Sequence, residues 1–183
     1  MSLKRYTIDG YGQVELNNVA FRRDGRIEAQ CKLDATDFAS VPAENGMLLA
    51  VDDLQRVVKF ATDASLPIAL HYSAEHMYNQ FTPGLKNFAL EKGTFLPRLG
   101  YLSVGDKFTT NTICYESTTY ADDDALDTAL AAIGTTPLYG GFTANGAIQV
   151  TATKPVSGPV LKVTKVTTMP DGQFGLKFQV LSA

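Results

Sequence analysis

The sequence has no tryptophan, only two cysteines and two histidines, and no surplus of positive charge. Its 16 Lys and Arg residues are outnumbered by 19 Asp and Glu residues, giving a formal net charge of -3 at pH 7. This balance argues against a nucleic-acid partner, because phosphates must be neutralised by cations. Two cysteines supply neither a disulfide framework nor a metal framework of their own. No long apolar run follows Met1, so we expect neither a signal peptide nor a membrane span.

The composition is that of a folded globular protein. Hydrophobic residues make up 45% of the chain and charged residues 19%, which does not fit a disordered or fibrous chain. The length of 183 residues suits one domain, at about 150 residues per domain. We therefore expect a single domain over residues 1–183, with the alternative of two β-subregions, 1–72 and 99–183, joined by a long interaction loop at 73–98.

Turn signals recur between short runs of β-branched and apolar residues. Asn-Gly and Asp-Gly pairs accept the positive φ angles of tight β-turns, so they predict many short antiparallel strands. The pairs are Asp9-Gly10, Asp24-Gly25, Asn45-Gly46, Asn145-Gly146 and Asp171-Gly172. The fold class that follows is mainly β, as an antiparallel β-barrel, a β-tulip-like barrel or a sandwich.

The clearest strand is predicted over 26–33, where Ile27, Ala29, Cys31 and Leu33 alternate with polar residues. Asp24-Gly25 then predicts a hairpin that turns residues 19–21 back onto this strand. A further hairpin pairs two arms around Asp52-Asp53, and its first arm is apolar on both faces and therefore interior. The other predicted strands are 47–51, 57–60, 67–72, 99–104, 108–116, 138–142, 147–151, 160–166 and 174–181, with a tight corner at Gly105-Asp106 and a final hairpin at 169–172.

One short amphipathic helix is predicted at about 122–133. Three aspartates at 122–124 match the positive end of the helix dipole, and Gly134 suits a left-handed cap. The apolar positions follow the 3.6-residue period; they are Leu126, Ala129, Leu130 and Ile133. Because alanines occupy most other positions, we expect the helix to pack on more than one side, against the β-structure or a partner.

No pattern of catalytic, cofactor or metal residues rises above background. His71 and His76 have no established metal spacing, and we expect the strand histidine to be satisfied by hydrogen bonds. No Gly-x-Ser-x-Gly elbow is present, and Gly140-Gly141 lacks the Lys-Ser/Thr of a phosphate loop. We therefore predict a non-enzymatic protein without cofactor. Cys31 and Cys114 are expected to be buried free thiols, with a disulfide open only if their strands are neighbours.

The segment 73–97 is long and rich in turn signals, and such a connection in a compact domain usually has a function. We expect a turn of helix around residues 85–90. Aromatic residues gather here and suit the centre of a protein interface, although a small core under the loop would use them equally well. The candidate interface residues are Tyr72, Tyr78, Phe81, Leu85, Phe88 and Phe95.

The stretch from Tyr101 to Phe108, with its Gly-Asp corner, and the β-rich tail from Gly146 to Leu181 resemble the head decoration or cement proteins of tailed bacteriophages. The resemblance implies a β-barrel or β-tulip that sits on the capsid surface, commonly as a trimer, and clamps major capsid protein subunits. It implies synthesis in the host cytoplasm, while the charge balance and the lack of a long apolar run predict no nucleic-acid or membrane partner. Two alternatives stay open: another virion component of tail, neck or baseplate, and a carbohydrate-binding or adhesion module.

Overall fold

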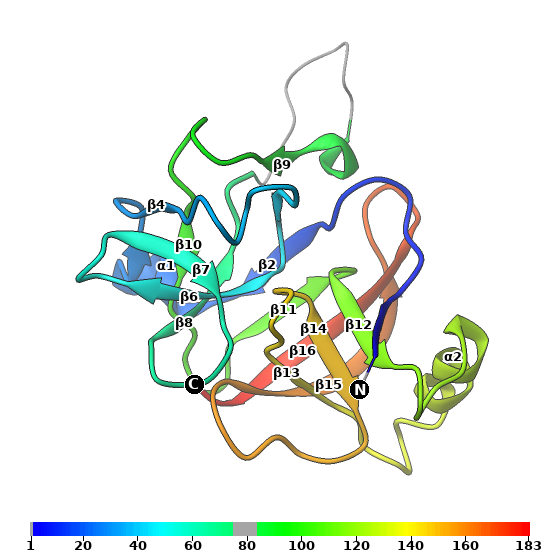
Figure 1. Cartoon of the computed structure of the whole chain (residues 1–183). Helices are drawn as coiled ribbons and strands as arrows, with labels where there is room; N and C mark the ends of the chain where they lie inside the picture. The colour runs from blue at the N-terminus through cyan, green and yellow to red at the C-terminus, as the bar shows by residue number, and fades with distance from the viewer. Residues whose placement is uncertain (1, 75–83) are drawn as a thin grey trace.

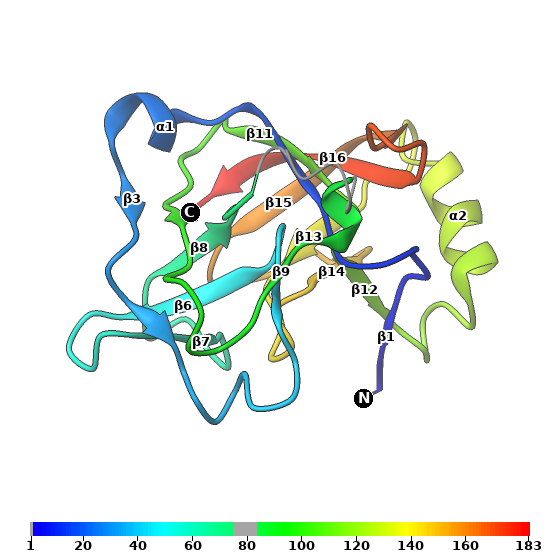
Figure 2. The ribbon, with the colours of Figure 1, turned by 90° about the horizontal axis from the view of Figure 1, so that it is seen from above.

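The computed structural model describes residues 2–74 and 84–183. Its strands form sheets of eight, six and two strands, so the predicted mainly β fold is confirmed. The arrangement is that of a sandwich, and within the described residues the strands do not close into a barrel. Figures 1 and 2 show the six-stranded sheet on one side of the eight-stranded sheet and helix α2 on the other.

The eight-stranded sheet has the order β1-β12-β14-β13-β15-β16-β11-β2. All its pairs are antiparallel except β12 with β14. The bounds are β1 Leu3–Arg5, β2 Val14–Asn18, β11 Lys107–Thr110, β12 Ile113–Glu116, β13 Tyr139–Gly141, β14 Ile148–Thr151, β15 Val160–Thr168 and β16 Phe174–Ser182. The predicted hairpin at 169–172 is confirmed as the connection between β15 and β16.

The six-stranded sheet has the order β3-β10-β8-β6-β7-β4, and β5 pairs with β9 as a separate ribbon. Its strand pairs are antiparallel except β4 with β7. The bounds are β3 Ile27–Glu28, β4 Lys32–Leu33, β5 Ala43–Glu44, β6 Leu48–Asp52, β7 Val57–Phe60, β8 Ile68–His71, β9 Ala89–Leu90 and β10 Leu99–Gly100. The two large sheets do not correspond to the expected subregions 1–72 and 99–183. Strands β1 and β2 pair with strands from the second subregion, and β10 pairs with strands from the first.

Strand β6 lies between two layers of apolar side chains, as its unbroken apolar sequence predicts. Leu48 and Ala50 belong to the main core between the two large sheets, whereas Leu49 and Val51 belong to a smaller core on the opposite face. This alternation follows from the two-residue period of a strand. The smaller core is covered by the segments that contain β4, β5 and β9.

The predicted strand over 108–116 is divided into β11 and β12 by Asn111 and Thr112. Only these two residues separate β11 from β12 in the chain, yet four strands lie between them in the sheet: β14, β13, β15 and β16. The eight-stranded sheet must therefore curl strongly. The corner predicted at Gly105-Asp106 is present, with Gly105 at a φ of 92°, and it carries the chain from the six-stranded to the eight-stranded sheet.

The predicted hairpin at Asp24-Gly25 is wrong. Residues 20–24 form helix α1 (Ala20–Asp24), and Gly25 ends it in the left-handed conformation with φ 70°. Asp106 supports the start of this helix, because its carboxylate accepts a hydrogen bond from the Ala20 amide at 2.8 Å. An Asp-Gly pair fits a helix end as well as a hairpin, and the tertiary contact at Ala20 decides between them.

The single strand predicted over 26–33 is also wrong, because it is interrupted between β3 and β4. The Glu28 carboxylate accepts hydrogen bonds from the Gln30 and Cys31 amides, and a side chain that binds nearby backbone in this way competes with a strand ladder. Cys31 and Leu33 are buried as expected, but Ile27 is 39% exposed.

Helix α2 (Asp123–Ala131) confirms the predicted helix. Asp122 caps it by accepting a hydrogen bond from the Ala125 amide at 2.9 Å, and Leu126 and Leu130 enter the main core. The expected left-handed cap at Gly134 is wrong, since Ala132 is the cap with φ -97°. The helix was expected to pack on more than one side, but within the described chain one side packs on the main core and Ala131 on the other side is exposed. None of the described helices has the length and hydropathy of a membrane span.

We expect Gly100→Ala to destabilise the fold by about 1–3 kcal/mol, because a Cβ there would lie 2.4 Å from the buried Phe21 ring. Gly134→Ala is the matched control, since no atom lies within 4 Å of the position that its methyl group would take and the backbone φ is not positive. Urea unfolding of both variants measures the difference. Equal stability of the two variants would contradict the packing of Phe21 against β10.

Candidate functional site

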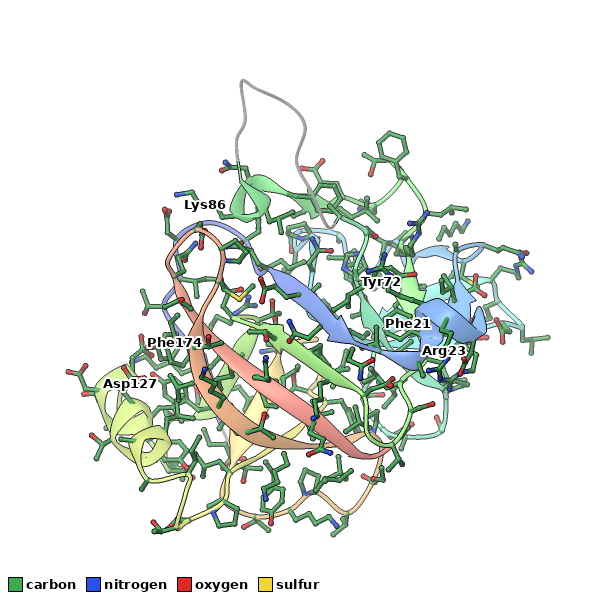
Figure 3. All side chains as sticks on the ribbon, turned by 180° about the vertical axis from the view of Figure 1, so that it is seen from behind. Phe21, Arg23, Tyr72, Lys86, Asp127 and Phe174 are labelled. Atoms are coloured by element: carbon green, nitrogen blue, oxygen red, sulfur yellow. The ribbon has the colours of Figure 1, made fainter. Side chains whose placement is uncertain are left out.

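The structure places four of the six residues expected at an interface, and these four differ in exposure. Tyr72 is buried with 2% of its surface exposed, and its ring packs on Phe21 with centroids 5.1 Å apart (Figure 3). Phe88 is partly buried against the smaller core. Leu85 lies half-buried in the short helix η1 (Leu85–Asn87), which confirms the predicted helical turn. Phe95 is 77% exposed. Two further members of the set, Tyr78 and Phe81, lie outside the described residues, as does His76.

Residues 38–42 and 91–98 form what we call the two-loop surface. The loops lie side by side, since a depression of about 300 Å³ is lined by residues 38–42 together with Glu91 and Lys92. Lys92 Nζ also donates a hydrogen bond at 3.4 Å to the Ala35 carbonyl, which lies just before the 38–42 loop in the chain. The surface covers the smaller core beside β9 and β10 (Figure 1).

The tip of the 91–98 loop exposes apolar side chains although its base is fixed. Near its start the Thr94 hydroxyl donates to the Glu91 carbonyl at 2.7 Å. At its end the Arg98 amide donates to Ser73 Oγ at 2.9 Å, and the Arg98 carbonyl accepts from the Tyr72 amide at 3.0 Å. Between these anchors Phe95 is 77% and Leu96 50% exposed.

Sequence reasoning identified Phe95 but missed Leu96 and Val41, the other exposed apolar residues of the two-loop surface. Val41 lies in a loop that reaches this surface only through tertiary packing, so no local pattern marks it. Leu96 directly follows Phe95, and a pair of adjacent large apolar residues between turn signals was the available signal. Phe95 and Leu96 are neighbours in the chain and both exposed, so this pair is the candidate contact with another molecule.

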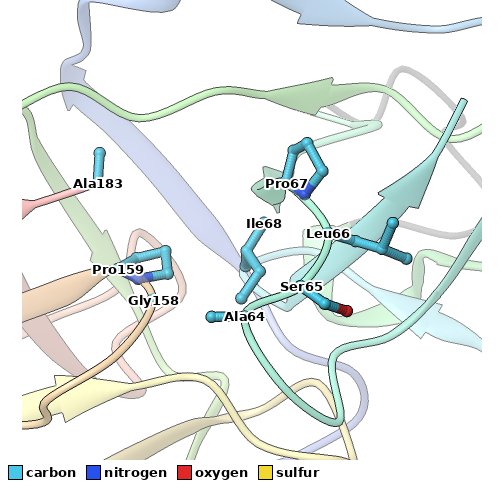
Figure 4. Close-up of a pocket in the computed structure, with 8 residues that line it drawn as sticks. All are labelled: Ala64, Ser65, Leu66, Pro67, Ile68, Gly158, Pro159 and Ala183. Carbon is cyan, nitrogen blue, oxygen red and sulfur yellow. The ribbon is translucent and has the colours of Figure 1, made fainter.

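A second depression, of about 400 Å³, lies between the two large sheets (Figure 4). It is lined by residues 64–68, by Gly158 and Pro159, and by Ala183. Apart from the hydroxyl of Ser65, these side chains are aliphatic and none titrates.

A buried polar turn at Glu44–Gly46 connects the sheets. From the eight-stranded side, the Thr112 hydroxyl donates to the Asn45 carbonyl and the Arg5 guanidinium pairs with the Glu44 carboxylate at 2.7 Å. From the six-stranded side, His71 Nδ1 lies 2.7 Å from the Glu44 carbonyl. The strand histidine is therefore satisfied by hydrogen bonds, as predicted.

His71 also forms a pair with Ser73, whose Oγ lies 2.6 Å from Nε2. The carbonyl at Nδ1 requires the proton there, so the Ser73 hydroxyl donates to Nε2 while its oxygen accepts from the Arg98 amide. Burial lowers the pKa of His71 to about 4. In a catalytic Ser-His-Asp triad a carboxylate would accept the hydrogen bond from the histidine, but here the acceptor at His71 Nδ1 is the Glu44 main-chain carbonyl. The Ser73–His71 pair therefore acts as a cross-link between β8 and the two-loop surface.

The two cysteines are free and buried, as predicted. Cys31 lies beside β4 in the six-stranded sheet and Cys114 in β12 of the eight-stranded sheet, so their strands are not neighbours. Burial raises the pKa of Cys114 to about 12. Comparison of the chain with protein-family models, curated proteins and solved structures gives no match.

We expect the stability of the protein to fall as the pH drops from 7.5 to 5. The folded pKa of His71 is about 4 against an ordinary 6.5, so the unfolded chain takes up a proton first. The loss is about 2 kcal/mol over this interval, at 1.36 kcal/mol per pKa unit. Carboxylates with a lowered pKa, such as those of Asp123 and Asp171, change the stability only at pH values below this interval.

Urea unfolding at several pH values measures this slope. In His71→Gln the slope should vanish even though the variant is less stable at pH 7.5, whereas His76→Gln should keep it. A wild-type protein with equal stability at both ends of the interval would contradict the assignment of a neutral buried imidazole.

Proposed function

We propose that the protein is a non-enzymatic structural protein of a tailed-phage particle, which binds the capsid surface and stabilises the shell as a decoration or cement protein. The proposal rests on the resemblance of the Gly-Asp corner and the β-rich tail together with the exposed two-loop surface. Its partner is the major capsid protein, and its location is the virion surface after synthesis in the host cytoplasm.

The observation that carries the proposal is the exposed pair Phe95 and Leu96 on a loop with a fixed base. A fixed loop loses little conformational entropy when it binds, so more of the burial energy appears as affinity. Phenylalanine and leucine also suit the apolar centre of an interface, where charged residues are depleted. A shell protein with an apolar depression would be a fitting partner.

One such contact is weak by itself. Full burial of the two side chains contributes about 1.5–3 kcal/mol each, and part of this is lost to the cost of association. Several linked copies overcome this limit, because the second and third contacts become intramolecular. The trimer that the resemblance implies would act in this way, and the bound copies would then oppose separation of neighbouring shell subunits without any turnover.

The test replaces both tip residues, as Phe95→Ser with Leu96→Ser. Because these side chains are exposed, the melting temperature should stay within about 2 °C of wild type, while binding to shells that lack the protein should fall at least tenfold. Leu54→Ser is the matched control, since Leu54 is 94% exposed on the β6–β7 turn and should leave binding unchanged. Co-sedimentation with shells measures the amount of each variant that binds. Undiminished binding by the double variant would remove the two-loop surface from the proposal.

Copy number per particle tests the proposed role independently of the binding surface. Quantitative mass spectrometry on purified virions from the source of this gene should give hundreds of copies, as expected of a protein that covers a shell lattice. A dozen or fewer would instead favour a tail, neck or baseplate component. Absence from the virion would refute the structural role altogether.

A further inference from the structure

Three side chains with metal-binding atoms converge from the end of β3, the start of β4 and the turn between β6 and β7. Glu28, Cys31 and Asp53 each offer one ligand atom, and these atoms all lie within 4.8 Å of one another. Cys31 Sγ is 4.0 Å from Asp53 Oδ1. Within residues 2–74 and 84–183, this is the one group of three such side chains that meets.

The fold builds this cluster from two turns that are fastened together. The Glu28 carboxylate binds the Gln30 and Cys31 amides and so folds residues 28–31 around the thiol. Asp53 comes from the turn between β6 and β7. The Arg56 carbonyl accepts a hydrogen bond from the Lys32 amide at 3.2 Å, and β4 runs parallel to β7 directly beyond this bond. The two turns therefore cannot separate without breaking the sheet.

The charge in this cluster is poorly compensated. In the described part of the chain neither Glu28 nor Asp53 forms an ion pair with a Lys or Arg side chain. Arg56 is near, but its guanidinium donates to Gln30 Oε1 at 3.0 Å. The thiol between the carboxylates is almost completely buried, with 1% exposed.

Tyr101 lies near this cluster and comes from a third segment of the chain. Its hydroxyl belongs to a segment that follows β10, far from both turns in the sequence. Burial, together with Asp53, Glu28 and Cys31, raises its pKa to about 12. A phenol oxygen, a buried thiol and two carboxylates thus share one region, with Arg56 as a nearby positive charge.

We propose that Glu28, Cys31 and Asp53 form a binding site for one Zn²⁺ ion, held by the Cys31 sulfur and one oxygen from each carboxylate. A thiolate ligand selects a borderline-soft cation such as Zn²⁺ over Ca²⁺ or Mg²⁺. The thiol releases its proton to solvent as the Zn–S bond forms. Thiolate and two carboxylates carry three negative charges, which Zn²⁺ and Arg56 together neutralise.

Three protein ligands leave the fourth tetrahedral position open for water. The Glu28 oxygen that accepts the Gln30 and Cys31 amides keeps those bonds and orients the other oxygen toward the ion. The ion would cross-link the turn at 28–31 to the turn at 53–56. This site lies in a single chain and does not depend on the proposed capsid role.

The test uses the full chain after removal of metal by a chelator and under reducing conditions. Isothermal titration with Zn²⁺ should give one site per chain, and Zn²⁺ at a hundredfold excess over its dissociation constant should raise the melting temperature by about 5–10 °C. Cd²⁺, as a spectroscopic probe, should produce an ultraviolet thiolate-to-metal charge-transfer band. No band and no thermal shift would overturn the proposal.

Cys31→Ser should abolish the Cd²⁺ band and weaken Zn²⁺ binding at least tenfold. Cys114→Ser is the matched control, because Cys114 is equally buried but is not part of any such cluster among the described residues. Asp53→Asn provides a variant that keeps the thiol and the exposed position, and it should also weaken binding at least tenfold. A band that survives in Cys31→Ser, or Zn²⁺ affinity that is unchanged in Asp53→Asn, would show that the metal binds elsewhere.

Discussion

The two large sheets have no strand in common within the described chain, and the buried turn at Glu44–Gly46 supplies polar contacts between them. Buried main-chain groups must find partners, and here each sheet provides some of them. Thr112 and Arg5 reach the turn from the eight-stranded sheet, and His71 reaches it from the six-stranded sheet. Gly46, at φ 89°, allows this approach, because a Cβ there would lie 2.1 Å from the Thr110 hydroxyl. Apolar packing alone tolerates sliding of one sheet over another, whereas these directional bonds fix one alignment.

The sequence predicted those elements whose cause is local. The α2 helix has its cap, its acidic first turn and its apolar face within ten residues, and the structure has all three. The apolar β6 arm is interior because an unbroken apolar strand cannot face water on either side. The failures share a different cause. Asp24-Gly25 fits both a hairpin and a helix end, and a contact from Asp106, far away in the chain, selects the helix.

The candidate site was less predictable than the fold for the same reason. Tyr72 and Phe95 are both aromatic residues at the ends of apolar runs, yet one is buried against Phe21 and the other is exposed. Their difference depends on which surface the chain covers after it leaves β8, and no local pattern encodes that path. Asp53 and Cys31 are 22 positions apart, so only the parallel pairing of β4 with β7 makes them neighbours.

The buried turn and the two-loop surface are linked through hydrogen bonds. A chain of hydrogen bonds runs from the Arg98 amide to Ser73 Oγ, from Ser73 to His71, and from His71 to the Glu44 carbonyl. A force applied to the exposed tip at Phe95 and Leu96 would therefore reach the junction of the two sheets through this chain rather than deform a free loop. Under the proposed shell-stabilising role, such a path would matter as much as the strength of any single contact, because a loop that yields under load transmits no resistance. A buried neutral histidine keeps this path intact at neutral pH, since its protonation would demand a charge where water cannot reach.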